Sequence, residues 1–288
     1  MGNNLGHGNV HDVYHFQKVK LGQGSFGVVW RGVHKQTGDV VAMKQLSKGD
    51  MPSRGVGPAD VQREVATLFA CRHANIIKLH HVFEDWQAYY LALEYCEGGD
   101  LGDKILERGL SIQEPEVMFW TRQMLASIAY LHMSSICHRD IKPDNYLVAQ
   151  AAGGPMLKLA DMGLAVRCGA DQLLFDKCGT PAYMAPEKHL LPRTPGYGLV
   201  VDVWSAGVSM YVLMYGGVHP FLSSNGLLKD AALLQGRLDF SHGALGSLGL
   251  GGDRISQGAR ALCQAMVCVH PGQRIRAQAA FDRAAGQP

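Results

Sequence analysis

Residues 136 to 148 read ICHRDIKPDNYLV and place a run of polar and charged side chains between apolar segments. Polar groups that leave water must be paired, because an unpaired one costs roughly 2–7 kcal/mol. This stretch is therefore either a polar network satisfied within the protein or a site that a charged partner completes. The polar residues are His138, Arg139, Asp140, Lys142, Asp144 and Asn145.

A second candidate site is the segment 21–29, LGQGSFGVV, in which Gly22, Gly24 and Gly27 have G-x-G-x-x-G spacing. Glycines let backbone N–H groups approach phosphate oxygens without interference from Cβ. Dinucleotide-binding folds share this spacing but need a helix directly after the glycines. Here two β-branched runs follow, separated by the turn KQTGD, which predicts a strand–glycine flap–strand that covers a nucleotide. A glycine-rich hairpin without a ligand is the alternative.

The second β-branched run ends in VAMK, which puts Lys44 at the end of an apolar strand. A buried lysine is costly unless it is paired. Glu64 is the natural partner, because it lies one helical turn before Leu68 on the same face of a predicted helix. A lysine held in this way beneath the glycine flap would bind nucleotide phosphates. An ordinary exposed ion pair is the alternative.

Two different kinds of element must position these residues. The first third of the chain predicts one helix at 59–70 and strands at 16–21, 27–33, 39–44, 76–83 and 89–95. From about residue 115 the apolar spacing is helical, at 116–132, 202–216 and 255–267. The glycine-containing junction EYCEGGD separates the two parts. The pattern predicts a small, strand-rich part followed by a larger helical part.

Composition excludes several classes of protein. The chain has 288 residues and a net charge of +2, which does not argue for nucleic acid as a partner. No apolar stretch reaches the roughly 18 residues of a membrane span. Seven scattered cysteines without CxxC fit a reduced intracellular protein better than a disulfide framework or a zinc site. The N-terminus lacks a secretory profile, and its Met-Gly start is only part of a myristoylation pattern at Gly2, since Gly6 replaces Ser or Thr. We therefore expect a cytoplasmic protein without stable membrane insertion.

The ordered motifs GQGSFGVV, VAMK, HRDIKPDN, DMG, APE and DVWSAGV resemble the signature set of the eukaryotic protein kinases. KPDN resembles the Ser/Thr kinases, and EYCEGGDL, CGTPAYMAPE and GGVHPF are similar to the calcium- and calmodulin-regulated branch. The resemblance, which covers residues 14–281, implies an α+β bilobal fold. Its N-lobe would be a small antiparallel sheet with one helix, and its C-lobe larger and mainly helical. The implied parts are a flexible leader at 1–13, the N-lobe at 14–93, the hinge at 94–100 and the C-lobe at 101–288.

The same resemblance implies roles in phosphoryl transfer, where catalysis is mainly positioning and charge neutralisation. Asp140 would accept or orient the proton of the attacking hydroxyl, and Lys142 would neutralise the γ-phosphoryl oxygens. Asn145 and Asp161 would bind Mg²⁺ through oxygen atoms. Lys44, oriented by Glu64, would hold the α- and β-phosphates. ATP and Mg²⁺ would thus complete the polar network of the catalytic stretch.

Positions around the nucleotide also follow from the resemblance. Glu94 would accept a hydrogen bond from adenine through its carbonyl, and Cys96 would donate one through its N–H. Asp100 would meet the ribose or, with Asp144, a basic substrate side chain, which implies Arg or Lys upstream of the acceptor. Both acids are also compatible with a solvated surface. The residues expected to sandwich the adenine are Leu21, Val29 and Ala42 above it and Leu147 below it.

Two positions concern regulation. In relatives of this kind, a phosphorylated residue often stands at the position of Asp176 and pairs with the arginine before the catalytic aspartate, here Arg139. A permanent carboxylate predicts that activation-loop phosphorylation is not needed, unless Asp176 is only a solvated loop acid. Met162 replaces the usual Phe of the metal motif, and a flexible Met can still pack. The resemblance also implies stability roles for Asp202 and for a Glu187–Arg274 ion pair.

Three functions therefore compete. The first is a protein kinase acting on Ser/Thr hydroxyls, the second a kinase-fold scaffold that binds nucleotide without transfer, and the third a kinase of a small molecule. Protein substrates are the expected partners. No calmodulin-binding segment or calcium loop follows the kinase motifs in this sequence. Calcium control, where the resemblance to that branch holds, would therefore come from a regulatory partner in trans or be lost.

Overall fold

The computed structural model describes residues 9–24, 27–169, 172–241 and 254–286. By the density of internal contacts the chain divides into two units. The first comprises Met1–Gly98 together with Ala149–Gly163, and the second comprises Gly99–Val148 together with Leu164–Pro288. The boundary after Gly98 falls within the segment 94–100 that the sequence indicates as a hinge.

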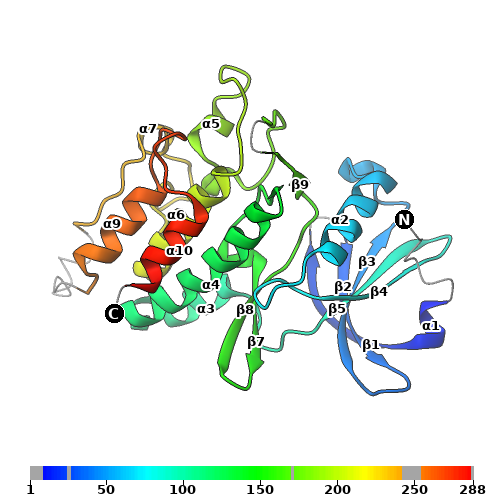
Figure 1. Ribbon diagram of the computed structural model, residues 1–288. Helices are drawn as coiled ribbons and strands as arrows, with labels where there is room; N and C mark the ends of the chain where they lie inside the picture. Colours follow the sequence, from blue (N-terminus) through cyan, green and yellow to red (C-terminus); the bar gives the residue numbers. More distant parts are fainter. Residues whose placement is uncertain (1–8, 25–26, 170–171, 242–253, 287–288) are drawn as a thin grey trace. The chain divides into compact units, whose positions relative to one another are not determined.

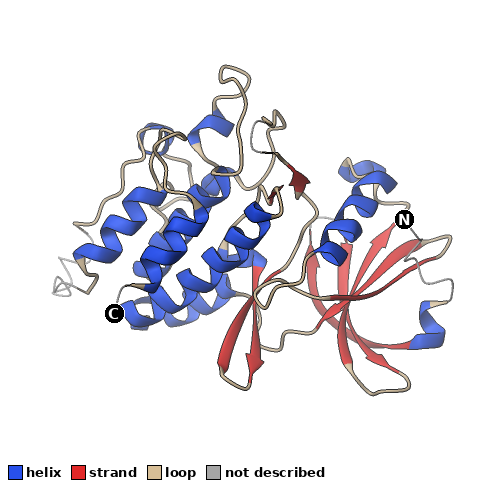
Figure 2. Ribbon diagram, in the orientation of Figure 1, coloured by secondary structure: helices blue, strands red, loops and turns tan. Residues whose placement is uncertain are grey.

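The first unit is built on a strongly twisted antiparallel sheet with the strand order β1-β2-β3-β5-β4 (Figures 1 and 2). The sheet confirms the small N-terminal lobe that the alternating and β-branched runs predict. Consecutive strands pair through short turns, so the chain needs no long crossover until β4. The strands are β1 (Tyr14–Gly24), β2 (Gly27–His34), β3 (Val40–Ser47), β4 (Leu79–Glu84) and β5 (Ala88–Glu94).

One helix, α2 (Pro58–Ala70), accompanies this sheet and follows the predicted helix at 59–70. Pro58 suits the first turn because its missing N–H would have no helical partner there. The Asp60 carboxylate accepts a hydrogen bond of 2.8 Å from the backbone N–H of Gly57. Val61, Glu64 and Leu68 are buried at helical spacing, so one face of α2 packs against the unit. A 3₁₀ turn, Pro52–Arg54, precedes the helix.

The expected leader at 1–13 ends in a short helix, α1 (Val10–Val13). The Asn9 side chain caps it by accepting a hydrogen bond from His11 N–H. Val10 is buried in a cluster with Tyr14, Val41 and Phe83, so apolar packing holds this segment against the sheet. Residues 1–8, including the partial myristoylation pattern at Gly2, lie outside the described residues.

Residues 149–163 fall within the range 101–288 that the resemblance implies for the C-lobe, but they group with the first unit. They include the end of β7 (Tyr146–Ala151) and all of β8 (Gly154–Leu159), which form a two-stranded ribbon. The reason is backbone pairing. Ile77 N–H donates to the Leu159 carbonyl at 3.0 Å, and Leu159 N–H donates to the Asn75 carbonyl at 2.9 Å. The same pairing explains why β4 begins at Leu79, later than the apolar run at 76–83 predicts.

The second unit is mainly helical, as the 3.6-residue apolar spacing after residue 115 predicts. Helices α4, α6, α9 and α10 pack side by side (Figure 1). Every residue of α6 is buried, which accounts for its nearly continuous apolar sequence. The helices are α3 (Leu101–Arg108), α4 (Glu114–Met133), α5 (Pro186–His189), α6 (Val201–Met214), α7 (Asp230–Leu234), α9 (Gln257–Met266) and α10 (Ala277–Ala285).

Short elements in the second unit carry the polar segment 138–145. The strand β6 (Ile136–Cys137) directly precedes the segment 138–145 and pairs antiparallel with β9 (Val166–Arg167). Further 3₁₀ turns lie at Gly109–Ser111, Pro143–Asn145 and Pro181–Tyr183. Among the described residues, no helix is both long and apolar enough to cross a membrane.

Candidate active site

Lys44 is the central cation of the first unit. It lies on β3 between β2 and β5, and its buried Nζ is 2.6 Å from Glu64 Oε1 on α2 and 3.2 Å from Asp161 Oδ1. Burial by itself lowers the pKa of Lys44, but the charges of Asp161 and Glu64 outweigh burial and hold that pKa above its ordinary value. The ammonium therefore stays charged near neutral pH, and the structure brings together three of the residues singled out from the sequence.

Asp161 follows β8 and adopts a left-handed backbone conformation with φ of 34°. Such a conformation is unusual for a residue with a side chain and concentrates at functional sites. Gly163 N–H donates to Asp161 Oδ1 at 3.3 Å, the same oxygen that Lys44 contacts. Met162, which follows it, is completely buried, so the thioether packs into the interior of the protein.

The glycines at the end of β1 and the start of β2 have different surroundings. Gly24 pairs with Gly27 across the two strands, and residues 25–26 between them lie outside the described residues. A Cβ on Gly27 would lie 2.1 Å from the Gln45 carbonyl oxygen of β3, so this glycine is needed for close strand packing. A Cβ on Gly22 would meet nothing within 4 Å. Of these two glycines, Gly22 therefore faces the open space where a phosphate could approach.

The residues expected around the adenine in the first unit lie on neighbouring strands. Ala42 on β3 is buried and pairs with Leu93 on β5. Val29 on β2 is partly exposed, and Leu21 on β1 is exposed. Burial, assisted by the charge of Glu94, raises the pKa of the Cys96 thiol to about 12, so this thiol stays protonated and unreactive.

The Glu94 carboxylate has two partners within the first unit. Its Oε1 lies 2.8 Å from Lys158 Nζ on β8, and its Oε2 accepts a hydrogen bond from Lys78 N–H at 3.2 Å. The carbonyl of Glu94 therefore stays the group proposed for adenine, while its carboxylate ties β5 to the segments around Lys78 and Lys158.

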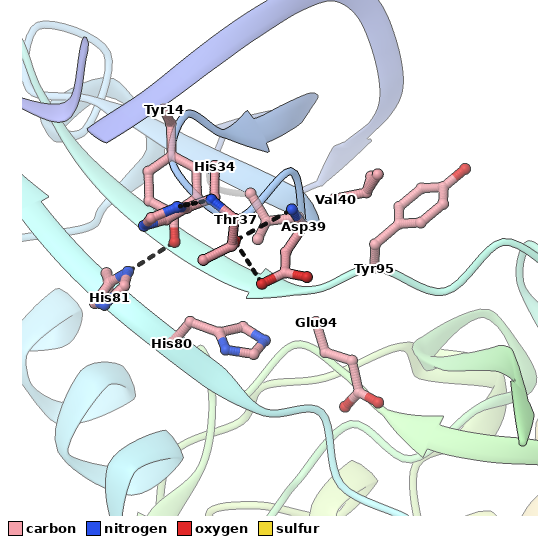
Figure 3. Close-up of a pocket in the computed structure, with 10 residues that line it drawn as sticks. Tyr14, His34, Thr37, Asp39, Val40, His80, His81, Glu94 and Tyr95 are labelled. Carbon is pink, nitrogen blue, oxygen red and sulfur yellow. Dashed lines mark hydrogen bonds between the residues drawn. The ribbon is translucent and has the colours of Figure 1, made fainter. Parts of the chain in front are cut away.

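Glu94 also lines a pocket of about 500 Å³ on the first unit, shown in Figure 3. Its polar groups largely satisfy one another. The Tyr14 hydroxyl and His81 Nδ1 are 2.7 Å apart, and Thr37 Oγ1 donates to Asp39 Oδ2 at 2.6 Å. Burial lowers the pKa of His81, which disfavours the charged imidazole that would attract an anion. Because Glu94 alone among the residues expected around the nucleotide lines this pocket, we do not assign the nucleotide to it.

The second unit holds the other half of the predicted site. The two carboxylate oxygens of Asp140 have different partners: Thr180 N–H donates to Oδ1 at 2.8 Å, and Lys142 Nζ is 3.5 Å from Oδ2. Lys142 also donates to Thr180 Oγ1 at 2.8 Å. Asn145 Nδ2 donates to the Asp140 carbonyl at 2.7 Å and to Oδ2 at 3.3 Å. The polar stretch is thus a network centred on Asp140.

Asn145 and Asp161, the two expected Mg²⁺ ligands, belong to different units. Their chemistry fits the ion, because Mg²⁺ prefers oxygen ligands and is bound through few protein groups plus substrate phosphates. Asn145 uses its Nδ2 as a donor to Asp140, which leaves its Oδ1 as the atom suited to a cation. Among the described residues, no cluster of three or more His, Cys, Asp or Glu side chains forms a self-contained metal site.

Asp202, at the start of α6, braces the backbone that leads to Asp140. Its two oxygens accept hydrogen bonds from His138 N–H at 2.9 Å and Arg139 N–H at 2.8 Å, and His132 Nε2 is 3.0 Å from Oδ2. Burial raises the pKa of Asp202, but these hydrogen bonds and the nearby histidines outweigh burial and leave that pKa below its ordinary value. The carboxylate is therefore ionised in the interior of the protein.

Two further ion pairs occupy the positions that the resemblance indicates. Arg274 binds Glu187 in a bidentate pair, with Nη1–Oε1 at 2.7 Å and Nη2–Oε2 at 2.9 Å, and both side chains are buried. Arg139 Nη1 donates to Asp176 Oδ2 at 3.0 Å. The first pair holds α5 near the segment before α10, and the second ties the segment after β9 to the residue before Asp140.

Asp100 and Leu147 lie side by side in an antiparallel bridge within the second unit, and Leu147 follows Asn145 of the Asp140 network by two residues. Asp100 caps α3, since its Oδ1 accepts a hydrogen bond from Asp103 N–H at 2.8 Å. Burial, with the charges of Asp103 and Asp144, raises the pKa of Asp100. Asp100 thus has a structural task as well as the ligand-binding one expected of it.

Three residues without a role in the sequence motifs, Thr180, Tyr197 and Lys188, also contact the catalytic segment. The Tyr197 hydroxyl donates to the Asp176 carbonyl at 2.8 Å and lies 3.4 Å from Arg139 Nη1. Lys188 Nζ donates to the Arg139 carbonyl at 3.0 Å. The sequence carries no signal for Lys188, because lysines are mostly exposed and its burial depends on contacts that are distant in the chain.

Comparison with known proteins places these residues in context. Residues 14–284 match the family model described as "Protein kinase domain". The chain is 35% identical to calcium-dependent protein kinase 20 of Oryza sativa, over 91% of this chain and 46% of the relative. It is 37% identical to serine/threonine-protein kinase DCLK3 of Homo sapiens, over 93% and 39%. It is 34% identical to calcium/calmodulin-dependent protein kinase type II of Caenorhabditis elegans, over 92% and 35%. The chain thus spans less than half the length of these relatives.

Proposed function

This chain belongs to the protein kinase family, and from that premise we propose that it transfers the γ-phosphoryl group of ATP to serine or threonine hydroxyls of proteins. The observation that carries the proposal is the buried contact between Lys44 Nζ and Glu64 Oε1 at 2.6 Å, with Asp161 Oδ1 at 3.2 Å. A buried cation held by two carboxylates is suited to phosphate oxygens, which would share its charge when ATP binds. Gly22, with open space around it, allows backbone approach to the same phosphates.

The network around Asp140 supports the chemical step. Thr180 N–H and Asn145 Nδ2 hold the Asp140 carboxylate, so its orientation is set before a substrate arrives. We infer that this carboxylate orients the substrate hydroxyl and accepts its proton. The Lys142 ammonium, held by Thr180 Oγ1, would neutralise charge that develops on the transferring phosphoryl group.

Asn145 Oδ1 and the Asp161 carboxylate would hold Mg²⁺. The ion, when bound, supplies charge neutralisation of the phosphate oxygens. Around the base, Leu21, Val29, Ala42 and Leu147 would give apolar contacts, and the Glu94 carbonyl and Cys96 N–H would give the hydrogen bonds. All these contacts are proposals that follow from family membership.

The competing function is a scaffold that binds nucleotide without transferring phosphate. It needs a missing or misdirected charged group, and none of the five charged or amide side chains that the chemistry requires is replaced in this chain. They are Lys44, Asp140, Lys142, Asn145 and Asp161. The buried Met162 changes an apolar contact and no charge. These features favour the active enzyme.

We also propose that the enzyme acts without phosphorylation of its activation segment. Arg139, which a phosphate would otherwise neutralise, already pairs with Asp176 at 3.0 Å. The Tyr197 hydroxyl holds the Asp176 carbonyl at 2.8 Å, and the backbones of Leu174 and Tyr197 exchange hydrogen bonds of 2.8 and 3.0 Å. A carboxylate thus occupies the place of the phosphate, with fewer acceptor oxygens.

Substrate choice and regulation are further parts of the proposal. Burial has the largest effect on the pKa of Asp100, and the charge of the nearby Asp144 raises that pKa further. The two carboxylates thus concentrate negative charge, which a basic substrate residue upstream of the acceptor would neutralise. The names of the relatives refer to calcium and calmodulin, which favours a regulatory partner acting in trans. Free cysteines throughout the described residues fit a reducing, cytoplasmic location.

A positional-scanning peptide assay with Mg-ATP tests the proposal. The wild type should phosphorylate Ser and Thr peptides, preferably those with Arg or Lys before the acceptor, whereas Tyr peptides should stay unmodified. Asp140→Asn should bind ATP but lose activity by about 10²-fold or more, the scale of a lost general base. Lys44→Met should weaken ATP binding as well. A wild-type chain that binds ATP and modifies no peptide would support the scaffold.

A further inference from the structure

Lys188 is a buried cation in the second unit with an unusual set of partners. Its side chain is only 1% exposed, and it lies in the short helix α5 directly after Glu187. Its Nζ donates a hydrogen bond of 3.0 Å to the Arg139 carbonyl and lies 5.0 Å from the centroid of the Tyr197 ring. Within the described part of the chain, Lys188 forms no ion pair. Burial of an ammonium that contacts one carbonyl and one aromatic face costs free energy, because these two partners only partly replace its hydration. Apolar packing alone therefore does not explain a lysine at this position.

The carbonyl that Lys188 binds belongs to a residue in an unfavourable conformation. Arg139 has φ of 73°, a left-handed conformation that residues with a side chain seldom adopt. On one side of this residue its N–H donates to Asp202 Oδ1 at 2.8 Å, and on the other its carbonyl accepts from Lys188. The anionic Asp202 therefore binds the N–H of Arg139, and the cationic Lys188 binds its carbonyl. Strain of this kind persists only where the surroundings hold it in place.

Lys188 and the Asp140 carboxylate meet at Gly179. A Cβ on Gly179 would lie 2.5 Å from the Arg139 carbonyl oxygen, 3.4 Å from Lys188 Nζ and 3.5 Å from Asp140 Oδ1. The next residue, Thr180, donates its N–H to Asp140 Oδ1 at 2.8 Å. The ammonium, the strained carbonyl and the candidate catalytic carboxylate thus converge on one glycine of the segment that precedes α5.

We propose that Lys188 is a positioning residue for Asp140: its ammonium holds the Arg139 carbonyl and thereby fixes the peptide that carries the catalytic carboxylate. The proposal rests on the proposed function, because it assigns Asp140 to the chemistry. The other charged groups close to this peptide are Asp202 and the Arg139 guanidinium, and Lys142 contacts the Asp140 side chain directly. None of them donates to the Arg139 carbonyl, so Lys188 has no substitute among them.

The decisive variant is Lys188→Met, because methionine has a similar length and suits a buried site but carries neither charge nor donor. Removal of a buried charge without a counter-ion stabilises the fold, whereas the Arg139 carbonyl loses its donor, so the melting temperature should change little. By contrast, kcat should fall by about tenfold or more, while KM for ATP should change by less than about twofold. Lys188→Arg, which keeps the charge and the donors, should recover kcat to at least about threefold above Lys188→Met. Lys35→Met, at an exposed lysine of the first unit, is the control and should match the wild type.

A purely structural lysine would lower the melting temperature and kcat together, and this result would overturn the proposal. A Lys188→Met kcat within about twofold of the wild type would overturn it as well. Hydrogen exchange of a peptide spanning residues 136–145 gives a readout that does not need kinase activity. This exchange should be faster in Lys188→Met and normal in Lys188→Arg, with α6 unchanged in both. If the wild type transfers no phosphate, the exchange result still decides the positioning role, so the two failures are distinguishable. If Lys188→Met does not fold, unchanged exchange and kcat in Lys188→Leu, which also carries neither charge nor donor, would overturn the proposal.

Discussion

The carboxylate of Asp176 lies 3.0 Å from the guanidinium of Arg139, although the Asp176 side chain is 78% exposed and the Arg139 side chain only 5%. A surface carboxylate therefore reaches an almost fully buried cation. Pairs between two exposed groups contribute little, but this pair has one desolvated member, which is less screened by salt. Arg139 immediately precedes Asp140, so the pair links the exposed segment after β9 to the candidate catalytic residue.

Removing the charge of Asp176 should therefore lower activity. We expect Asp176→Asn to reduce kcat by about three- to tenfold, because the buried Arg139 loses its anionic partner, and Asp176→Glu to retain more activity. The wild type should keep its full activity after phosphatase treatment. Asp230→Asn, at an exposed acid of α7, serves as the control. A wild-type enzyme that phosphatase inactivates would contradict the proposal that phosphorylation of this segment is unnecessary.

The two glycines whose surroundings differ give a matched pair of variants. Gly27→Ala should lower the free energy of unfolding by about 2 kcal/mol or more, because its Cβ would collide with the Gln45 carbonyl and the backbone of β3 cannot yield cheaply. Gly22→Ala should leave stability unchanged, since nothing lies within 4 Å of the added methyl group. If Gly22 lies beside phosphates, Gly22→Ala should instead raise KM for ATP. Thermal unfolding and steady-state kinetics measure both effects, and equal stability losses in the two variants would refute the distinction.

Asp100 offers a way to separate a structural role from a substrate-binding role. Asparagine caps helices about as well as aspartate, so Asp100→Asn should preserve the hydrogen bond to Asp103 N–H and the stability of α3. The variant removes the negative charge. We expect kcat/KM to fall by about tenfold for a peptide with basic residues upstream of the acceptor and to stay constant for a neutral peptide. Equal effects on both peptides would identify Asp100 as a cap alone.

His219 predicts a specific pH dependence of stability. Burial, with the charge of Lys229, lowers the pKa of His219 to about 4 in the folded protein. The unfolded chain binds a proton at this residue below about pH 6.5, so the stabilising contribution is complete above that pH and is lost as the pH falls towards about 4. The loss should reach roughly 3 kcal/mol at most. Denaturant unfolding between these pH values measures it.

The control for this prediction is His219→Asn. Its side-chain oxygen can accept the hydrogen bond that His219 Nδ1 receives from Phe221 N–H at 3.1 Å, but it does not titrate in this range. Its unfolding free energy should depend less on pH than that of the wild type. An identical slope in the two proteins would show that other groups cause the acid sensitivity.

The sequence was informative where local patterns determine structure. The apolar spacing of 59–70 predicts α2, and the same spacing places Glu64 on the face that meets Lys44. The β-branched runs predict the central strands within a few residues. The contacts that local patterns do not predict join segments that are distant in the chain. Asn75 and Ile77 bind Leu159, and this pairing moves the end of the β7–β8 ribbon into the first unit.

The residues of the candidate site also divide into those that local sequence patterns identify and those that only long-range contacts reveal. Motif order singles out Asp140, Lys142 and Asn145, because their roles depend on residue type and close spacing. Lys188 could not be assigned in this way, since its task depends on a carbonyl 49 residues earlier and on the space left by Gly179. The helix-capping bond of Asp100 was also missed, because a carboxylate can cap a helix and bind a substrate with the same sequence signature.

The most direct test of the central claim measures phosphoryl transfer and nucleotide consumption together. The purified chain would be incubated with Mg-ATP and a serine peptide that carries upstream arginines, with Asp140→Asn as the control. The account predicts one phosphoserine formed for each ADP released, and a rate at least about 10²-fold lower in the variant. A chain that binds ATP yet forms no phosphopeptide, or an Asp140→Asn variant as active as the wild type, would contradict it.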